Sequence, residues 1–326
     1  MPRRLLAALA VVCLPIVPAV AQTDDGIGTF VLENDLFTGR DDDYTNGIQI
    51  GYLSGADLVP IWVHDAAALL PFYNVKTTVR STVTIGQAMY TPADIRLKDP
   101  PRDDRPYAGW LYTSIGLIAE DGDQLDQLQL SVGVVGPLSG AEQAQKFVHK
   151  VINSPRPSGW SKQLHNEPGV ILTYQHSDRA FVSGEVVGFA FDATPHFGGA
   201  VGNVMTYANA GVTLRLGYHL PDDYGPPRIQ PSLPGNGYFE ATDDVGWYLF
   251  AGFDARLVAR NIFLDGNTFG SSRSVDKRLV VGDAQVGAAI TWRRFRLAYT
   301  HVFRTKEFGD EDTPDAFGAL SLSVKF

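Results

Sequence analysis

The feature that most constrains this chain is an alternation of apolar and polar residues that recurs along most of its length. In the segment 127–135, Leu128, Leu130 and Val132 share one face, while Gln, Ser and Gly residues occupy the other. Because successive side chains of a strand point to opposite faces, a period of two predicts a half-buried β-strand. The pattern returns at 48–52, 212–218, 247–254 and 282–287 and predicts an all-β fold. Water-soluble β-sandwiches also alternate, so this pattern does not choose between the two classes.

Three further features favour a transmembrane β-barrel. The polar faces are rich in Gly, Gln, Asp, Arg and Thr, as expected for a hydrated barrel interior. Aromatic residues near the predicted strand ends could form interfacial girdles: Tyr90, Trp110, Tyr112, Trp247 and Trp292. The chain also ends in strict alternation from Leu320 to a terminal Phe326, like the closing strand that the outer-membrane barrel-assembly machinery recognises. An open sheet edge in hydrocarbon leaves backbone groups unpaired at several kcal/mol each, so the sheet must close.

We therefore expect a 12-stranded antiparallel transmembrane β-barrel of the outer membrane. The twelve candidate strands are 28–37, 45–55, 81–91, 108–119, 124–136, 169–178, 182–196, 201–218, 246–262, 278–292, 295–307 and 316–326. The segments 38–44, 92–107, 137–168, 197–200, 263–277 and 308–315 should then face outward. The connections 56–80 and 219–245 are long for periplasmic turns, and the second, rich in Pro and Gly, is expected to be an ordered loop.

Charge, hydropathy and the N-terminal residues narrow the class further. The chain carries 27 Lys+Arg against 36 Asp+Glu, a formal charge of -9 without a basic stripe, and this argues against a nucleic-acid partner. With a mean hydropathy of -0.06 and no long apolar run after residue 21, a multi-helix membrane protein is excluded. Residues 1–21 combine Arg3 and Arg4, an apolar core and the sequence Ala19-Val20-Ala21, and they predict a signal peptide ahead of a barrel domain at 22–326. The only cysteine, Cys13, lies within that segment, so we expect a mature chain without disulfides.

One outward segment has the pattern of a helix. Ser139 and Glu142 have the spacing of a capping box, and Gln145 and His149 are one helical turn apart. The apolar stripe of this helix consists of Ala144, Phe147, Val148 and Val151. We expect a short amphipathic helix in an extracellular loop, with this stripe packed on the barrel rim and Glu142, Gln145 and His149 on the opposite side. His149 could then be an ordinary solvated surface histidine or a functional imidazole.

A second polar cluster lies at the tip of the first predicted hairpin. Glu33-Asn34-Asp35 ends one strand, and the segment 41–47 (Asp-Asp-Asp-Tyr-Thr-Asn-Gly) begins the next. Carboxylates and amides supply the hard oxygen ligands that Ca²⁺ takes, although the same residue types populate ordinary turns. The sequence contains no nucleophile elbow, zincin motif, Walker loop or dinucleotide fingerprint, so a serine-hydrolase triad has no support.

Taken in order, these motifs resemble the lipid A 3-O-deacylase (LpxR) family. The residues that carry the resemblance are Glu33-Asn34-Asp35, the segments 43–47 (Asp-Tyr-Thr-Asn-Gly), 104–110 (Asp-Arg-Pro-Tyr-Ala-Gly-Trp) and 133–137 (Gly-Val-Val-Gly-Pro) with His149 twelve residues after the proline, and 159–168. The resemblance covers nearly the whole mature chain. It implies an outer-membrane barrel that removes the 3′-linked acyloxyacyl group of lipid A, or of lipopolysaccharide, in a Ca²⁺-dependent hydrolysis.

The resemblance also implies roles for individual residues. The catalytic residues fall on His149, Asn34, Asp35, Thr45 and Gln145, the Ca²⁺ ligands on Asn34 and Asp35, and a basic substrate-binding residue on Lys98. A neutral imidazole can deprotonate water near pH 7, and a bound Ca²⁺ can polarise the ester carbonyl. Removing a comparable oxyanion donor costs roughly 3–4 kcal/mol. The active site is expected to face the cell exterior.

Two other functions fit the same barrel. One is a non-enzymatic channel or structural protein, for which Asp254, Arg256 and Asp283 would be candidate members of a charged ring. The other is an outer-membrane phospholipase or acyltransferase, which would act on phospholipid vesicles that lack lipid A.

Overall fold

The computed structural model describes residues 26–35, 43–56, 58, 59, 61, 63, 65, 78–226, 237–240, 242–311 and 313–326. The predicted signal peptide, with Cys13, lies outside these residues. The strands are β1 (Ile27–Asn34), β2 (Asp43–Leu53), β3 (Thr78–Thr91), β4 (Ala108–Asp121), β5 (Gln124–Val135), β6 (Glu167–Asp178), β7 (Val182–Val186), β8 (Phe189–Gly202), β9 (Met205–Tyr218), β10 (Thr242–Asn261), β11 (Val280–Arg293), β12 (Phe295–Arg304) and β13 (Asp315–Lys325). The helical elements are η2 (Pro137–Ser139), α3 (Ala141–Ile152), η3 (Trp160–Lys162) and α4 (Ile262–Asp265). No helix among the described residues is long and apolar enough to span a membrane.

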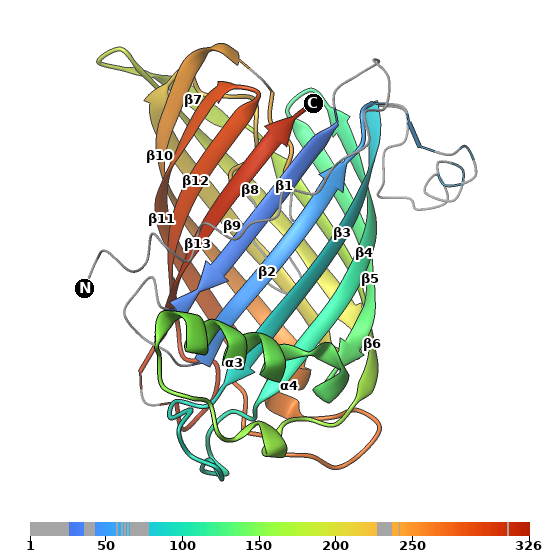
Figure 1. Ribbon diagram of the computed structural model, residues 1–326. Helices are drawn as coiled ribbons and strands as arrows, with labels where there is room; N and C mark the ends of the chain where they lie inside the picture. The colour runs from blue at the N-terminus through green and yellow to red at the C-terminus, as the bar shows by residue number, and fades with distance from the viewer. Residues whose placement is uncertain are drawn as a thin grey trace.

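Twelve strands form a closed antiparallel barrel, which confirms the predicted fold class (Figure 1). The first strand closes onto the last, with β1 and β13 in register from Ile27↔Lys325 to Asn34↔Gly318. The other neighbours follow chain order, except that β6 pairs with β8. The short strand β7 pairs with the beginning of β8, and β6 pairs with the rest of that strand. Since β7 extends β6 along the same neighbour, it does not add a thirteenth strand around the barrel. Figure 1 shows α3 and α4 at one end of the barrel, here called the helix end, and residue 326 at the other, the turn end.

The boundaries of the middle strands differ from the prediction. The turn expected at 197–200 lies inside β8, and the chain reverses instead at residues 203 and 204. Positions 198 and 199 require glycine because the neighbouring strand backbones lie very close to them. A Cβ on Gly198 would lie 2.3 Å from the Tyr174 carbonyl oxygen. The true hairpin turn, within the predicted strand 182–196, has Val187 at a φ of 50° before Gly188 at 80°. Valine rarely adopts a positive φ, so the sequence carried little turn signal there.

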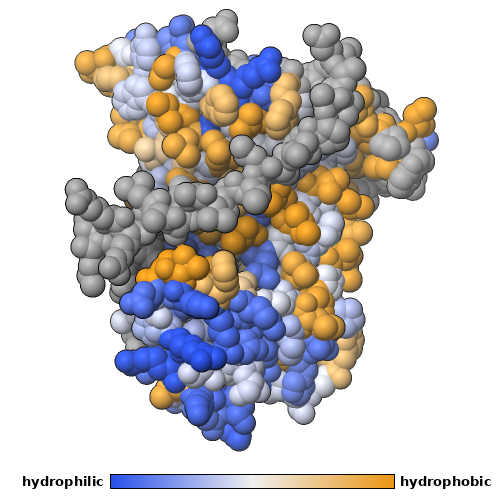
Figure 2. Space-filling view, viewed as in Figure 1, coloured by the Kyte–Doolittle hydropathy of each residue, from blue (hydrophilic) through white to orange (hydrophobic). Residues whose placement is uncertain are grey.

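The wall of the barrel has two chemically different faces. Along β4, Leu111 and Ile115 point outward and are exposed, whereas Trp110 and Ser114 point inward and are buried. The inward Ser114 hydroxyl shares a hydrogen bond of 2.8 Å with the Ser131 hydroxyl on β5. Figure 2 shows hydrophobic residues gathered around the middle of the barrel and a mostly hydrophilic surface at the helix end. Apolar residues out and polar residues in is the arrangement of a barrel embedded in lipid.

Paired charges fill the lumen toward the helix end. Asp283 accepts from Arg304 (Nε–Oδ1, 2.9 Å) and pairs with Arg256 (Nη2–Oδ2, 2.9 Å). Asp254 accepts from the Asn209 amide at 2.8 Å and lies 3.0 Å from Nε2 of His196. Three of these side chains, Asp254, Arg256 and Asp283, are the ones that the channel hypothesis required as a charged ring. They are buried and contact partners in the wall.

The turn end of the lumen is occupied by part of the connection between β9 and β10. Asp223 from this connection is fully buried and accepts hydrogen bonds from Arg215, Arg296 and Tyr248, the last two at 2.9 Å. Arg215 also pairs with Asp192 (Nε–Oδ1, 2.9 Å). The described part of this connection therefore contributes side chains to the lumen.

Candidate active site

The loop helix α3 forms where the sequence predicts it, but its N-terminus is built differently. Gly140, with a φ of 70°, is the N-cap residue, and no side chain caps the helix. Ser139 belongs to the preceding turn η2, where its hydroxyl accepts only from the backbone N–H of Ala141, at 3.4 Å. The predicted capping box between Ser139 and Glu142 is therefore wrong. The Pro137 turn places Ser139 one residue too early to cap the helix.

The side of α3 that packs on the barrel is also not the one predicted, although Ala144 of the predicted stripe is partly buried there. Gln145 and His149 are buried, with exposed fractions of 2% and 4%. In the stripe expected to pack on the rim, Phe147 is 67% and Val151 is 59% exposed. Hydrophobic periodicity finds a helix and its sectors, but it cannot say which sector a neighbouring wall will cover. The hydrogen-bond partners of this buried side are Trp160 for Gln145 and Pro155 for His149, and both come from the segment that follows the helix.

Alternation along the strands places α3 on the outer surface of the wall. Gly109 shares the outward face of β4 with Leu111, and a Cβ on Gly109 would lie 2.1 Å from the Ser139 hydroxyl and 2.4 Å from Cβ of Ala141. On β3, Gln87 donates to the Ser139 carbonyl oxygen at 2.6 Å. Only glycine lets η2 and the start of α3 approach the wall this closely.

A row of residues in register leads from this contact to the first hairpin. Gly109 is opposite Met89, Met89 is opposite Asn46, and Asn46 is opposite Asn34. Met89 is buried in a cluster with Ala141 of α3. From β4 to β1 is three strand spacings, about 14 Å, and a helix of 12 residues is about 18 Å long. Figure 1 shows α3 crossing the ends of these strands toward β1.

The imidazole ring of His149, on the buried side of α3, is held in a defined orientation. Its Nδ1 lies 2.6 Å from the carbonyl oxygen of Pro155, in the chain that follows the helix. A carbonyl oxygen can only accept, so Nδ1 carries the hydrogen. In the neutral ring, the lone pair is then on Nε2. A backbone carbonyl that fixes the tautomer is a common way to prepare a histidine for proton transfer.

Gln145, one turn earlier, has its own support. Its Oε1 accepts from the indole N–H of Trp160 at 2.7 Å, and Trp160 packs against Tyr107 with ring centroids 4.9 Å apart. The Gln145 amide nitrogen is buried and has no hydrogen-bond partner among the described residues. The site thus contains an amide whose acceptor is engaged and whose donor is available.

Sequence reasoning assigned no role to Trp160 or Pro155. Trp160 lies in a motif quoted for the family resemblance, whereas a backbone carbonyl leaves no sequence signal.

The first hairpin contributes residues at the same end of the barrel. Asn34 follows Leu32 on the outward face of β1 and is partly buried. Glu33 points to the lumen and is fully buried, as is Asp35 directly after the strand. The Asn46 amide donates to the Glu33 carbonyl oxygen at 3.1 Å. The structure thus brings Asn34 and Asp35 to the end that also carries His149.

The two remaining predicted site residues are Thr45 and Lys98. Thr45 belongs to β2, but its side chain lies outside the described residues. Lys98 is exposed in the loop between β3 and β4. This loop contacts the segment after α3, where the Ser158 N–H donates to the Ile95 carbonyl at 2.8 Å. The same carbonyl accepts from the Tyr107 hydroxyl at 3.0 Å.

The motif at 104–110 anchors this loop to the barrel. Arg105 is buried and donates to Glu307 at 2.8 Å, and its guanidinium lies over the Tyr90 and Phe308 rings. Burial raises the pKa of Glu307, but the charges of Arg304 and Arg105 outweigh it and hold this pKa below its usual range. The cationic side chain of this motif is therefore a structural anchor rather than a substrate contact.

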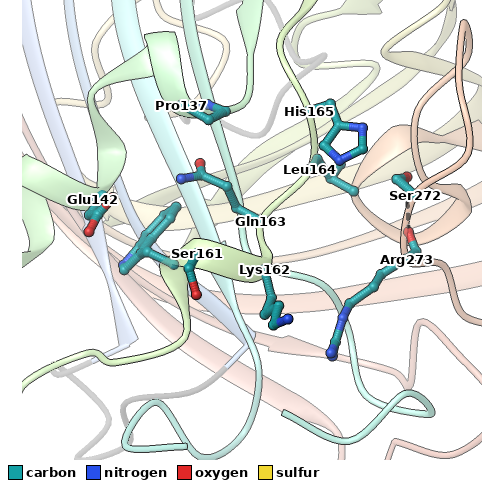
Figure 3. Close-up of a pocket in the computed structure, with 10 residues that line it drawn as sticks. Pro137, Glu142, Ser161, Lys162, Gln163, Leu164, His165, Ser272 and Arg273 are labelled. Atoms are coloured by element: carbon teal, nitrogen blue, oxygen red, sulfur yellow. Dashed lines mark hydrogen bonds between the residues drawn. The ribbon is translucent and has the colours of Figure 1, made fainter. Parts of the chain in front are cut away.

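A shallow cavity of about 480 Å³ opens beside the N-terminal part of α3 (Figure 3). Its ten lining residues are Pro137, Glu142, Trp160, Ser161, Lys162, Gln163, Leu164, His165, Ser272 and Arg273. The Lys162 and Arg273 side chains extend toward the same side of it. None of the predicted catalytic residues lines this cavity, so it neighbours the predicted site without containing it.

The described residues contain no ready-made cluster of metal ligands. No group of three or more His, Cys, Asp or Glu side chains is close enough to share an ion within this part of the chain. Asn34 and Asp35 would offer a cation one amide oxygen and one carboxylate, donors of the kind that Ca²⁺ takes.

Comparison with known proteins gives the chain its relatives. A family model described as "Outer membrane protein LpxR" matches residues 5–326. The structure of LpxR from Salmonella typhimurium is similar, with a TM-score of 0.75 and 20% identity over 92% of this chain and all of that one. The β domain of the Bordetella autotransporter BrkA gives a TM-score of only 0.45 at 9% identity, over 94% of this chain and 100% of that one. A search of curated protein sequences gave no significant match. The family model covers the chain almost from end to end, and the barrel agrees with it: this protein belongs to the LpxR family of outer-membrane proteins.

Proposed function

We propose that this protein is a Ca²⁺-dependent carboxylic ester hydrolase that removes the 3′-linked acyloxyacyl group of lipid A in the outer leaflet. The observation that carries the proposal is the placement of His149. A histidine that the sequence would allow on an exposed helix surface is buried against the outer wall, with its Nδ1–H on the Pro155 carbonyl. Family membership supports the substrate class.

The position on the wall suits an ester in a membrane lipid. The contact between α3 and the strands lies on the outer surface, near the end of the apolar face of the barrel. Longer loops mark the extracellular end of outer-membrane barrels, so we assign the helix end to the cell exterior. A lipid in the outer leaflet would then bring its ester bonds to the level of His149 while its acyl chains run along the barrel wall.

In the proposed reaction, Nε2 of His149 takes a proton from a water molecule as the water oxygen attacks the ester carbonyl carbon. The bond from that carbon to the sugar 3′-oxygen then breaks, and the imidazolium returns the proton to this oxygen. The products are a free sugar hydroxyl and an acyloxyacyl carboxylic acid. Ca²⁺ held by Asn34 and Asp35 would polarise the carbonyl and stabilise the negative charge on its oxygen.

The remaining predicted residues take positioning roles in this scheme. The Gln145 amide N–H, which has no partner among the described residues, is oriented by Trp160 and can donate to the water or the carbonyl oxygen. Thr45 would assist from β2. Lys98, exposed on the neighbouring loop, would contact a lipid A phosphate.

The test is hydrolysis in cells whose lipid A is known. Expression of the chain should lower the mass of lipid A by the acyloxyacyl group, measured by mass spectrometry of extracted lipid. His149→Ala should abolish this mass loss, and His165→Ala, an exposed histidine of the same loop, should retain it. An unchanged acyl pattern with correctly folded wild-type protein and millimolar Ca²⁺ would refute the proposal. Folding is judged in each case by heat-modifiable migration on gels.

The channel alternative has less support from this molecule. Asp283 is paired with Arg256 and Arg304 on the strands beside it, and Asp223 brings part of the connection between β9 and β10 into the turn end. Steady conductance of the wild-type protein in planar bilayers, together with no lipid hydrolysis, would restore that alternative. Release of fatty acid from vesicles that lack lipid A would instead favour a phospholipase.

A further inference from the structure

The apolar flank of α3, which comprises Phe147, Val148 and Val151, has no cover in the described protein. These side chains are 67%, 39% and 59% exposed. They lie on one side of the helix, because Val151 is four positions after Phe147 and three after Val148, and such residues are neighbours on a helix. A contiguous exposed apolar face usually marks an interaction surface.

The opposite side of the helix is charged. Glu142 and Lys146 form an ion pair one turn apart, and Lys150 is exposed beyond them. The buried line that includes Gln145 and His149 lies between the two flanks and faces the barrel. The helix therefore has three sectors: one against the wall, one apolar and one charged. A helix that lies in a membrane interface has an apolar and a charged sector of this kind.

The wall beneath α3 continues directly into the lipid-facing surface. The outward residues two positions deeper than the row beneath α3 are Ile48, Gln87 and Leu111, which stand opposite one another on β2, β3 and β4. Ile48 and Leu111 are already exposed, and the next outward row contains Ile50 and Ile85, at 47% and 53%. Two residues along a strand are about 7 Å, so α3 lies at the edge of this apolar surface.

Figures 1 and 2 agree with this placement. On the face that Figure 2 shows, hydrophobic residues gather down to the level where α3 crosses the strands, and the surface beyond it is mostly hydrophilic. The level of the helix is thus the level at which the protein surface changes from hydrocarbon-like to water-like.

We propose that the apolar flank of α3 is immersed in the acyl chains of the outer leaflet, with its charged flank among the lipid head groups. The occupant of this surface is membrane lipid, because the flank is continuous with a surface that lipid already covers. Glu142 of the charged flank lines the cavity together with loop residues such as Trp160 and Arg273, so this flank faces the loops of the helix end, where anionic head groups would attract Lys146 and Lys150. The inference stands on exposure and position, so it holds whether or not the site beneath the helix is catalytic.

Site-directed spin labelling tests the placement. The only native cysteine is Cys13, so a Cys13→Ala background allows single cysteines to be labelled with a nitroxide in proteoliposomes. Phe147→Cys and Val151→Cys report on the apolar flank, and Lys150→Cys reports on the charged flank. Ile115→Cys, on an outward position of β4 that is 58% exposed, is the reference for lipid. All four positions are partly or largely exposed, so labels there should not disturb packing.

The measured quantity is the accessibility of each nitroxide to oxygen, which dissolves in hydrocarbon, and to a water-soluble nickel chelate. We expect the labels on Phe147→Cys and Val151→Cys to resemble that on Ile115→Cys, with nickel accessibility several-fold below that of Lys150→Cys. Equal nickel accessibility at both flanks would overturn the proposal. So would low accessibility to both reagents with spin–spin broadening that grows with protein density, because a second copy of the chain would then cover the flank. Lipid hydrolysis is not read in this experiment, so its outcome is independent of the proposed reaction.

Discussion

The ion pairs at the turn end of the lumen make a quantitative prediction for Asp223→Asn. The wild-type cluster has two cations, Arg215 and Arg296, and two anions, Asp192 and Asp223, so its charges balance. All four side chains are at most 6% exposed. The amide keeps the shape of the carboxylate but leaves one positive charge without compensation in a buried place. Breaking a buried pair in this way costs about 3–5 kcal/mol of unfolding free energy.

The matched control is the neighbouring residue. Asp222 is also an aspartate of this connection, but its side chain is 56% exposed and its ion pair with Arg179 is on the surface. Asp222→Asn should therefore cost less than about 1 kcal/mol. Denaturant unfolding in detergent micelles, followed by tryptophan fluorescence, measures both. If Asp223→Asn is no less stable than Asp222→Asn, the buried charges do not hold this connection in the lumen. The explanation of how the turn end of the lumen is filled would then be wrong.

Four further predictions concern the site and the loops around it. Gly109→Val should displace α3 and lower the rate of lipid A deacylation on the order of a hundredfold, whereas Gly270→Val, with no atom within 4 Å of its added Cβ, should leave that rate unchanged. Trp160→Phe keeps the packing but removes the hydrogen bond to Gln145, and it should slow the same reaction about five- to tenfold without changing heat-modifiable migration. Chelation of Ca²⁺ should stop hydrolysis, and added Ca²⁺ should restore it. Because the pKa of Glu307 is held low in the folded state, its stabilising effect is present above the unfolded pKa of about 4.3 and lost as pH falls; Glu307→Gln should be less stable than wild type at pH 7, with a gap that narrows toward pH 3.

Most of the barrel could be predicted because lipid and closure impose a simple rule on the sequence. Each spanning strand must alternate, and the final strand must pair with the first, as Phe326 and Gly26 do through a backbone hydrogen bond of 2.9 Å. The rule fails where the signal is local. Gly198 and Gly199 have the composition of a turn, but they are small because adjacent backbones approach them within a strand. Composition alone cannot separate these two uses of glycine.

The sequence names candidate site residues, which stay a prediction, but it does not show how they are assembled. Motif order placed Asn34, Asp35 and His149 in the sequence, and topology brought them to one end of the barrel. The side of α3 that faces the wall depends on contacts with Gly109 and Gln87, which are far from the helix in sequence. Amphipathicity predicts burial of the apolar side only when the surrounding solvent is water. Beside a membrane, the apolar side can face outward.

In the proposed reaction, the position of α3 on the outside of the barrel also determines how substrate arrives. A site on the outer wall would be reached by lateral diffusion within a two-dimensional lipid film, and both the trimmed lipid and the released fatty acid would return to that film. Turnover should therefore follow the mole fraction of substrate in the bilayer and be insensitive to the amount of vesicle suspension at a fixed composition. Dilution with inert lipid should slow the reaction, while dilution with buffer should not.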